Sequence, residues 1–195
     1  HTTYDAMLDV WREADGIPVI EHAWLFDHFA PTQGSLDGLC FEGWTLLTAF
    51  AAKTSRLRMG LMVTGNTYRN PAVLANVAAT VDVVSNGRLD FGIGAGWNVY
   101  EHESMDIPLY APGERIRRLG EACDLIKQLW TQPVTTFDGR YYHLKEARCE
   151  PKPIQQPYPP FVIGGGGPKI LGVAAREAQI VGVNAFLRAG EPTAT

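Results

Sequence analysis

The sequence alternates short, mainly apolar runs with segments whose apolar residues recur at helical spacing. The runs Leu57–Val63 and Arg88–Ile93 lack the strict polar alternation of half-exposed strands, which is typical of strands buried on both faces of a parallel sheet. Between them, Asn70-Pro71 predicts the start of a helix, because Asn is a good N-cap and Pro suits the first helical position. This alternation predicts an α/β domain in which helices cover a parallel sheet.

The same reasoning assigns the other elements. Helices are expected over residues 4–14, 43–52, 71–84, 112–130 and 170–178. Strands are expected over residues 23–26, 57–63, 88–93, 161–163 and 180–184. A hairpin is expected where 134–137 and 140–144 flank Asp138-Gly139, a strong two-residue turn signal. Residues 187–195 show no periodic pattern, so we expect one domain over 1–195 that ends in a loose tail.

Two architectures fit this alternation, a doubly wound open sheet and a (β/α)8 barrel of the TIM type. Polar or glycine-rich loops follow nearly every expected strand, at Asp27-His28, Thr64–Asn66, Gly94–Trp97 and Gly164–Gly167. Loops from several strands share one face in a barrel, whereas a doubly wound sheet concentrates its site at one switch point. We therefore expect the barrel. It would be incomplete or truncated, because about five strand–helix units are present and a complete barrel runs to ~250 residues.

Charge and cysteine content limit the partners. The 17 Lys and Arg residues are dispersed and face 21 Asp and Glu residues, for a formal charge of −4. This offers no electrostatic footprint for nucleic acid or an anionic membrane, and no apolar run approaches the ~20 residues that span a bilayer. Small-molecule partners are therefore expected, with no nucleic acid and no membrane. Cys40, Cys123 and Cys149 are far apart and odd in number, which favours a reducing cytoplasm over a disulfide framework.

The residues that could carry chemistry lie in the loops after the strands. Asp27-His28 offers a carboxylate that could orient an imidazole acid or base, although the pair could equally cap the next turn. Gly164–Gly167 precedes an expected helix, so free backbone N–H groups could bind a phosphate there, with a flexible hinge as the alternative. Gly94-Ala95-Gly96 admits either a flat ligand or tight packing, and Trp97 could stack on a ring.

Several common catalytic motifs are absent from the sequence, among them G-x-S-x-G, Walker A, H-E-x-x-H and G-x-G-x-x-G. This disfavours a simple serine hydrolase, a P-loop enzyme and a zincin. The five histidines show no helical pair spacing, so no metal site is expected.

Four phrases, in order along the chain, resemble the luciferase-like monooxygenase superfamily, and most of all its branch that uses coenzyme F-420, a deazaflavin. They are FDHFAP (26–31), TGNTYRNPAVLANVAATVDVVSNGRLDFGIGAGW (64–97), GERIRRLGEACDLIKQLW (113–130) and EPKPIQQPYPPFVIGGGG (150–167). The likeness covers roughly residues 15–184. It implies a (β/α) barrel that binds a flavin or deazaflavin at the carboxyl ends of its strands. It also implies hydride transfer at C5 of a deazaflavin, or oxygen activation by reduced FMN.

Carried over motif by motif, the resemblance assigns a role to each loop. Asp27 would hydrogen-bond the ring system, and His28 would sit beside the substrate as acid or base. Met62, Val63 and Thr64 match a bulge, often with a non-prolyl cis peptide, that backs the ring. The other side of the ring would be lined by Gly94, Ala95, Gly96 and Trp97. The phosphate would be cradled by Gly165, Gly166 and Gly167.

The resemblance predicts an F-420-dependent oxidoreductase that moves a hydride to or from a small organic substrate. An FMN-dependent monooxygenase is the first alternative, and a non-catalytic flavin-binding protein or inactive fragment is an alternative of another class. Because F-420 carries an acidic oligoglutamate tail, basic residues should surround the phosphate, with Lys152, Lys169 and Arg176 as candidates. Some relatives that oxidise sugar phosphates carry Glu where Trp97 stands, which argues against that substrate.

The resemblance also suggests a homodimer. Many relatives dimerise through a pair of helices, which here would involve the segments near 42–52 and 71–84. Their small residues would permit close packing between copies; they are Ala49, Ala51, Ala52, Ala75, Ala78 and Ala79.

Overall fold

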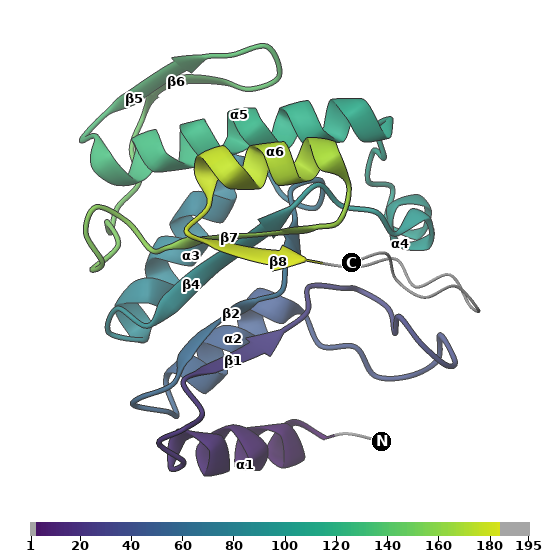
Figure 1. The fold of residues 1–195 in the computed structure, drawn as a ribbon, viewed down its shortest axis with the longest axis vertical. Helices are drawn as coiled ribbons and strands as arrows, with labels where there is room; N and C mark the ends of the chain where they lie inside the picture. Colours follow the sequence, from purple (N-terminus) through teal and green to yellow (C-terminus); the bar gives the residue numbers. More distant parts are fainter. Residues whose placement is uncertain (1–2, 184–195) are drawn as a thin grey trace.

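The computed structural model describes residues 3–183 and shows a curved sheet of parallel strands (Figure 1). The strands of this sheet are β1 (His22–Leu25), β2 (Arg58–Leu61), β3 (Thr64–Gly65), β4 (Leu89–Gly94), β7 (Phe161–Gly165) and β8 (Ile180–Val183). The helices are α1 (Tyr4–Asp15), α2 (Gly43–Ala51), α3 (Pro71–Val84), α4 (Val99–Ser104), α5 (Pro112–Thr131) and α6 (Pro168–Glu177). A separate antiparallel hairpin consists of β5 (Thr135–Asp138) and β6 (His143–Ala147).

The order of the strands distinguishes the two expected architectures. The sheet runs β1-β2-β4-β7-β8 with every pair parallel, and β3 lies beside β4. This order follows the chain without reversal, so the described sheet has no switch point and curls in the manner of a barrel. The prediction of an incomplete (β/α) barrel is therefore confirmed. The expected tail over 187–195 and the last residue of the expected strand 180–184 lie outside the described residues.

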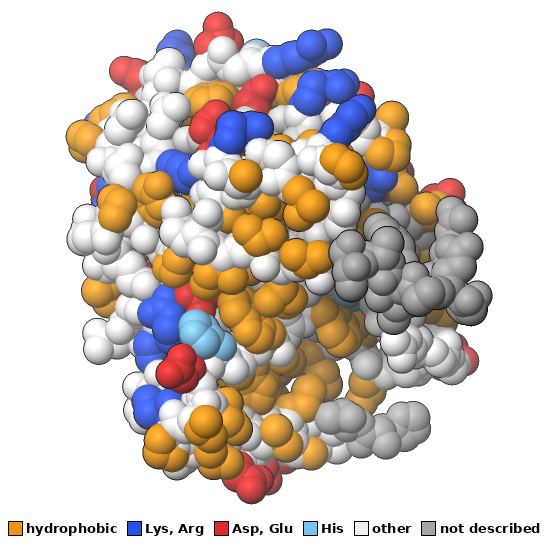
Figure 2. All heavy atoms as spheres, in the orientation of Figure 1, with side chains coloured by type: hydrophobic (Ala, Val, Ile, Leu, Met, Phe, Trp, Pro, Cys, Tyr) orange, Lys and Arg blue, Asp and Glu red, His pale blue; other side chains and the backbone are white. Residues whose placement is uncertain are grey.

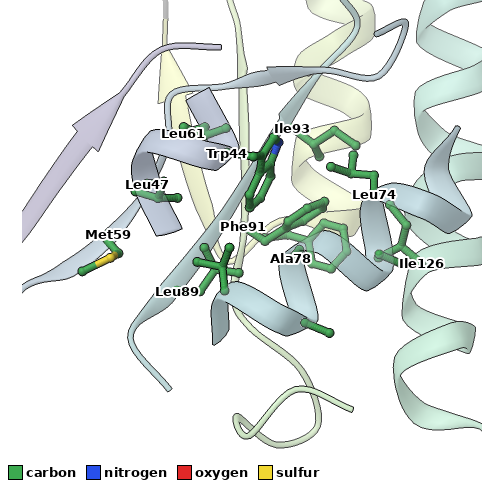
Figure 3. Packing of buried hydrophobic residues seen from close by; sticks show 14 of the residues in the cluster. Trp44, Leu47, Met59, Leu61, Leu74, Ala78, Leu89, Phe91, Ile93 and Ile126 are labelled. Atoms are coloured by element: carbon green, nitrogen blue, oxygen red, sulfur yellow. The ribbon is translucent and has the colours of Figure 1, made fainter. Parts of the chain in front are cut away.

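The helices cover one side of the sheet. Figure 1 shows α2 and α3 behind β2 and β4, and α5 and α6 above β7 and β8. The ring of Phe91 on β4 lies 6.0 Å from the ring of Trp44 on α2 (Figure 3). It also lies 5.1 Å from the ring of Trp130 on α5 and 5.0 Å from that of Phe161 on β7. Each buried side chain of this size contributes ~1.5–3 kcal/mol. This packing fixes α2 and α5 against the strands and so fixes where the strands end.

The other side of the sheet is also apolar. Figure 2 shows hydrophobic side chains gathered over the middle of the view, where β2, β4, β7 and β8 lie in Figure 1. The ring of Trp24 on β1 extends across Gly60 of β2, since a Cβ at Gly60 would lie 2.6 Å from that ring. Glycine is therefore required at this point of the sheet.

Three of the small residues on the helices pack within this chain. Ala75, Ala78 and Ala79 of α3 are all 0% exposed, and they belong to the core of this chain. Helix α3 packs against α2 and α5, so these alanines allow close approach within one protomer. These three alanines are therefore not exposed to a second copy, and the homodimer itself stays a prediction.

The hairpin also differs from the prediction. Asp138 pairs with His143, so the turn spans 139–142 and the expected two-residue turn at Asp138-Gly139 is wrong. The cause is a tertiary contact that local turn propensity does not include. Glu121 of α5 accepts hydrogen bonds from the backbone N–H groups of Arg140, Tyr141 and Tyr142. This contact holds the longer turn against the helix.

Candidate functional site

The carboxyl ends of the strands bring the predicted site residues to one edge of the sheet. Asp27 and His28 follow β1, Met62–Thr64 follow β2, Gly94–Trp97 end β4, and Gly165–Gly167 link β7 to α6. Since neighbouring strands are parallel, these ends lie at the same edge. In chain order the segments are far apart, and the barrel topology alone brings them together.

The segment after β2 has the geometry expected from the resemblance. The peptide bond between Met62 and Val63 is cis although neither residue is proline. The side chain of Val63 lies over glycines of the neighbouring strands: a Cβ at Gly94 would lie 2.7 Å from it, and one at Gly92 or Gly164 would lie 3.3 Å from it. Gly94 therefore makes room for Val63, so tight packing accounts for this glycine. Its contact with a flat ring stays a prediction.

The loop after β4 is held from outside. Gly96 has a φ of 77°, a left-handed conformation that favours glycine, and a Cβ there would lie 2.3 Å from Oγ1 of Thr67. The guanidinium of Arg115 on α5 donates to the carbonyl oxygen of Gly96. These contacts leave Trp97 at the end of the loop with 63% of its surface exposed.

Asp27 lies in a buried ion pair that the sequence did not reveal. Its carboxylate binds Arg69 through both oxygens and also accepts a hydrogen bond from the hydroxyl of Thr64. Arg69 reaches further to Glu42, the N-cap of α2. Burial raises the pKa of Glu42, but hydrogen bonds from Thr45 and the charge of Arg69 lower it below its ordinary value. Asp27 is thus at the predicted edge, and its hydrogen bond to a ring system stays a prediction.

His28 contacts a second buried carboxylate. Its Nδ1 lies 3.0 Å and 2.9 Å from the two carboxylate oxygens of Glu101 on α4. The same carboxylate accepts hydrogen bonds from the hydroxyl of Tyr68 and from the backbone N–H groups of Phe29 and Ala30. The side chain of Glu101 is 0% exposed, and that of His28 is 12% exposed. Neither Glu101 nor Tyr68 was identified from the sequence as a site residue.

Two aromatic rings flank His28. The ring of Phe26 lies 5.5 Å from the imidazole and that of Trp97 lies 5.6 Å from it. Phe26 is 51% exposed and Trp97 is 63% exposed. The imidazole therefore has two large, partly exposed aromatic rings beside it at the carboxyl edge of the sheet.

The junction of β7 and α6 suits an anion. Gly167 is the N-cap of α6, and no side chain caps this helix, so its first N–H groups lack a side-chain partner. A Cβ at Gly167 would meet no heavy atom within 4 Å, whereas one at Gly165 would lie 2.5 Å from Ile170. Gly165 therefore serves packing, and Gly167 leaves open space at a helix N-terminus. A phosphate fits this arrangement, because the helix dipole and free N–H groups favour negative charge.

Of the three basic residues expected around the phosphate, only Lys169 lies beside the proposed site, in the first turn of α6. Arg176 lies in the last turn of α6, roughly 12 Å further along at 1.5 Å per residue. The ammonium group of Lys152 binds the carbonyl oxygens of Leu129 and Gln132 at the end of α5. The expectation is therefore wrong for Arg176 and Lys152. Arg176 lies at the C-terminal end of α6 and Lys152 at the C-terminal end of α5, and both ends are far from the start of α6.

Among known protein families, the one described as luciferase-like monooxygenase matches residues 4–193. An F420-dependent glucose-6-phosphate dehydrogenase of Kineococcus radiotolerans is 39% identical over 158 residues, covering 80% of this chain and 46% of that protein. The chain therefore spans about half the length of that relative.

Two solved structures share the fold. An F420-dependent secondary alcohol dehydrogenase, in complex with an F420-acetone adduct, has a TM-score of 0.83 at 24% identity, covering 93% of this chain and 54% of that one. The coenzyme F420-dependent tetrahydromethanopterin reductase of Methanopyrus kandleri has a TM-score of 0.73 at 27% identity. The match covers 95% of this chain and 53% of that one.

Within residues 3–183, no helix is both long and apolar enough to cross a bilayer. The same residues contain no group of three or more His, Cys, Asp or Glu side chains placed to hold a metal ion.

Proposed function

Because the chain belongs to the luciferase-like monooxygenase family, we propose that it is the cofactor-binding part of an F-420-dependent oxidoreductase. The reaction moves a hydride between the deazaflavin and a small organic substrate. The observation that carries the proposal is the shared edge of the sheet, where α6 begins after β7 with no side-chain cap and the largely buried His28 follows β1. The relatives named above support F-420 as the cofactor.

The residues at this edge have separate roles in binding and in proton transfer. The N–H groups at the start of α6, with Gly166 and Gly167, bind the cofactor phosphate, and Lys169 adds positive charge beside them. Val63 and the loop Gly94–Trp97 form the walls for the ring. When bound, a deazaflavin supplies the acceptor or donor of the hydride. Oxidation of an alcohol also releases a proton from oxygen, and the imidazole of His28 takes it; in the reverse direction the imidazole returns it.

The substrate is a small apolar molecule rather than a sugar phosphate. The exposed rings of Phe26 and Trp97 lie next to His28 and offer apolar contact. Two guanidinium groups at this edge are already bound: that of Arg69 pairs with Asp27 and Glu42, and that of Arg115 donates to the carbonyl oxygen of Gly96. This departs from the substrate in the name of the Kineococcus relative.

An FMN-dependent monooxygenase is the second candidate, because there is little positive charge at the start of α6. F-420 carries an acidic tail, and of the expected basic residues only Lys169 stands at the start of α6. A fluorescence titration of the purified protein with F-420 and with FMN separates the two. Tighter binding of F-420 supports the proposal, and tighter binding of FMN overturns it. Binding of either without turnover of any alcohol or carbonyl substrate would support a non-catalytic flavin-binding protein.

A homodimer and a cytoplasmic location complete the proposal. Helix α3 still exposes apolar side chains, with Val73 59% exposed and Val84 40% exposed, and these could face a second copy. The three cysteines are free thiols, in keeping with a reducing compartment. Light scattering after gel filtration tests the dimer, because a monomer at micromolar concentration would exclude it.

A further inference from the structure

We propose that Glu101 is a positioning residue for His28: its buried carboxylate holds the proton on Nδ1 and leaves Nε2 as the nitrogen that exchanges a proton with the substrate. The inference rests on the proposed role of His28 and deepens it. It concerns contacts within this chain, so it can be tested without cofactor.

The geometry fixes which nitrogen carries the proton. Nδ1 of His28 lies 3.0 Å and 2.9 Å from the two oxygens of Glu101. An ionised carboxylate can only accept hydrogen bonds, so the nitrogen that faces it must carry hydrogen. Burial raises the pKa of Glu101, but hydrogen bonds from Tyr68, His28 and the Phe29 and Ala30 amides lower it below its ordinary value. The carboxylate is therefore ionised at neutral pH, and the lone pair of the neutral imidazole is on Nε2.

Glu101 is itself held in place. The backbone N–H groups of Phe29 and Ala30 lie 2.8 Å and 3.1 Å from Oε1, and the hydroxyl of Tyr68 donates to Oε2. Burial and the hydrogen bond to Glu101 raise the pKa of Tyr68 above its ordinary value, so the hydroxyl stays protonated and keeps donating. The carboxylate therefore has no freedom to turn away from His28.

The imidazole is oriented as well as protonated. Phe26 and Trp97 flank its ring, and 12% of its side chain remains exposed. No residue in the described part of the chain hydrogen-bonds Nε2, while Nδ1 is fully engaged. The free nitrogen is thus the one available to a ligand.

This arrangement gives the proton a defined route. In alcohol oxidation, the O–H bond of the substrate breaks as an N–H bond forms at Nε2, and a bound deazaflavin would supply the acceptor for the hydride from carbon. The alcohol becomes a carbonyl compound, and His28 becomes an imidazolium. The imidazolium is paired with the carboxylate of Glu101, which stabilises its positive charge. In carbonyl reduction the same proton returns to oxygen.

The direct test is the tautomer of His28 in the cofactor-free protein, read from ¹⁵N chemical shifts and long-range ¹H–¹⁵N couplings. His28→Gln identifies the resonance by its loss. We expect protonated Nδ1 and unprotonated Nε2 at a pH where the ring is neutral. A proton on Nε2 with a bare Nδ1 overturns the proposal, and this measurement needs no variant of Glu101.

Glu101→Gln tests the consequence. The backbone N–H groups of Phe29 and Ala30 retain the remaining oxygen, so the new amide nitrogen faces Nδ1 and donates to it. We expect the proton to move to Nε2 and kcat to fall at least about tenfold, with KM and cofactor affinity nearly unchanged. Glu101→Asp keeps the charge and should recover part of kcat. Glu103→Gln, the same change at an exposed position of α4, is the matched control and should alter neither.

Every outcome decides between the alternatives. A folded Glu101→Gln variant with the wild-type tautomer and wild-type kcat overturns the proposal. If that variant does not fold, the wild-type tautomer decides, together with Tyr68→Phe, which keeps the partner of Nδ1 and should preserve its proton. Failure of F-420 to bind would overturn the proposed function and leave the tautomer result standing, so the two failures are distinguishable.

Discussion

Asp27 and Arg69 form a bidentate ion pair at the carboxyl edge of the sheet. Nη1 of Arg69 lies 2.6 Å from Oδ2 of Asp27, and Nη2 lies 3.0 Å from Oδ1. The side chain of Asp27 is 0% exposed and that of Arg69 is 17% exposed. The pair ties the loop after β1 to the start of α3 and so holds the residue next to His28.

Removal of Arg69 should therefore destabilise the fold. Arg69→Met leaves the charge of Asp27 buried and without its cation, which costs about 3–5 kcal/mol. Chemical denaturation measures the free energy of unfolding. Arg12→Met is the control, because Arg12 is 52% exposed and lies 3.9 Å from the exposed carboxylate of Asp9. A change at Arg69 no larger than the change at Arg12 would contradict the structural role of the pair.

Gly167→Val tests the phosphate site. A Cβ at Gly167 meets no heavy atom within 4 Å, and its φ of −86° suits any residue, so the variant should fold normally. The added side chain would occupy the space proposed for the phosphate. We expect the dissociation constant of the cofactor to rise at least tenfold, or ~1.4 kcal/mol. Gly172→Ala, at an equally open position on the same helix, should leave binding unchanged. Equal affinity of both variants would place the phosphate elsewhere.

The central strands could be predicted because they are buried on both faces and therefore consist of continuous apolar runs. All six residues of β4 are buried, so an apolar run with no surface face was a sufficient signal. The start of α3 was equally local, since the side chain of Asn70 caps the N–H of Ala72 at 2.9 Å. Where neighbouring residues alone determine the structure, sequence and structure agree.

Helix α4 was missed for a physical reason. Its buried residues are Glu101 and His102, so apolar periodicity cannot reveal it. A signal was nonetheless present, because Asn98 and Glu101 have the spacing of a helix N-cap and its third residue. The partners of Asp27 and His28 lie 42 and 73 residues away, and contacts at such separations follow from the barrel topology rather than from local pattern.

His28→Ala tests the proton transfer itself. If the imidazole is the acid or base, turnover should fall by roughly 10²–10⁴. Cofactor affinity should barely change, because we propose that the glycine loops and the start of α6 bind the cofactor. Melting temperature is measured on the same preparation, since a purely structural His28 would lower stability and leave turnover per folded molecule intact. His143→Ala, at a 64% exposed side chain, is the control.

Asp15 should make stability depend on pH in the acid range. Its carboxylate accepts hydrogen bonds of 2.8 Å from the backbone N–H groups of Ser55, Arg56 and Leu57. Burial raises the pKa of Asp15, but these hydrogen bonds outweigh it and lower the pKa from 3.8 to about 2. The unfolded chain therefore takes up the proton first as pH falls. The stabilisation is fully present above about pH 4 and is lost as the pH approaches 2.

Urea denaturation at a series of pH values between about 5 and 2 measures this effect. The wild-type protein should lose more free energy of unfolding across this range than Asp15→Asn, because the variant has no proton to take up at this position. Asp9→Asn removes a carboxylate from the same helix whose side chain is 76% exposed, and it should follow the wild-type curve. If Asp15→Asn and the wild type lose stability in parallel, the hydrogen bonds to the 55–57 backbone do not favour the ionised carboxylate, and the contact between α1 and the segment before β2 contributes through packing alone.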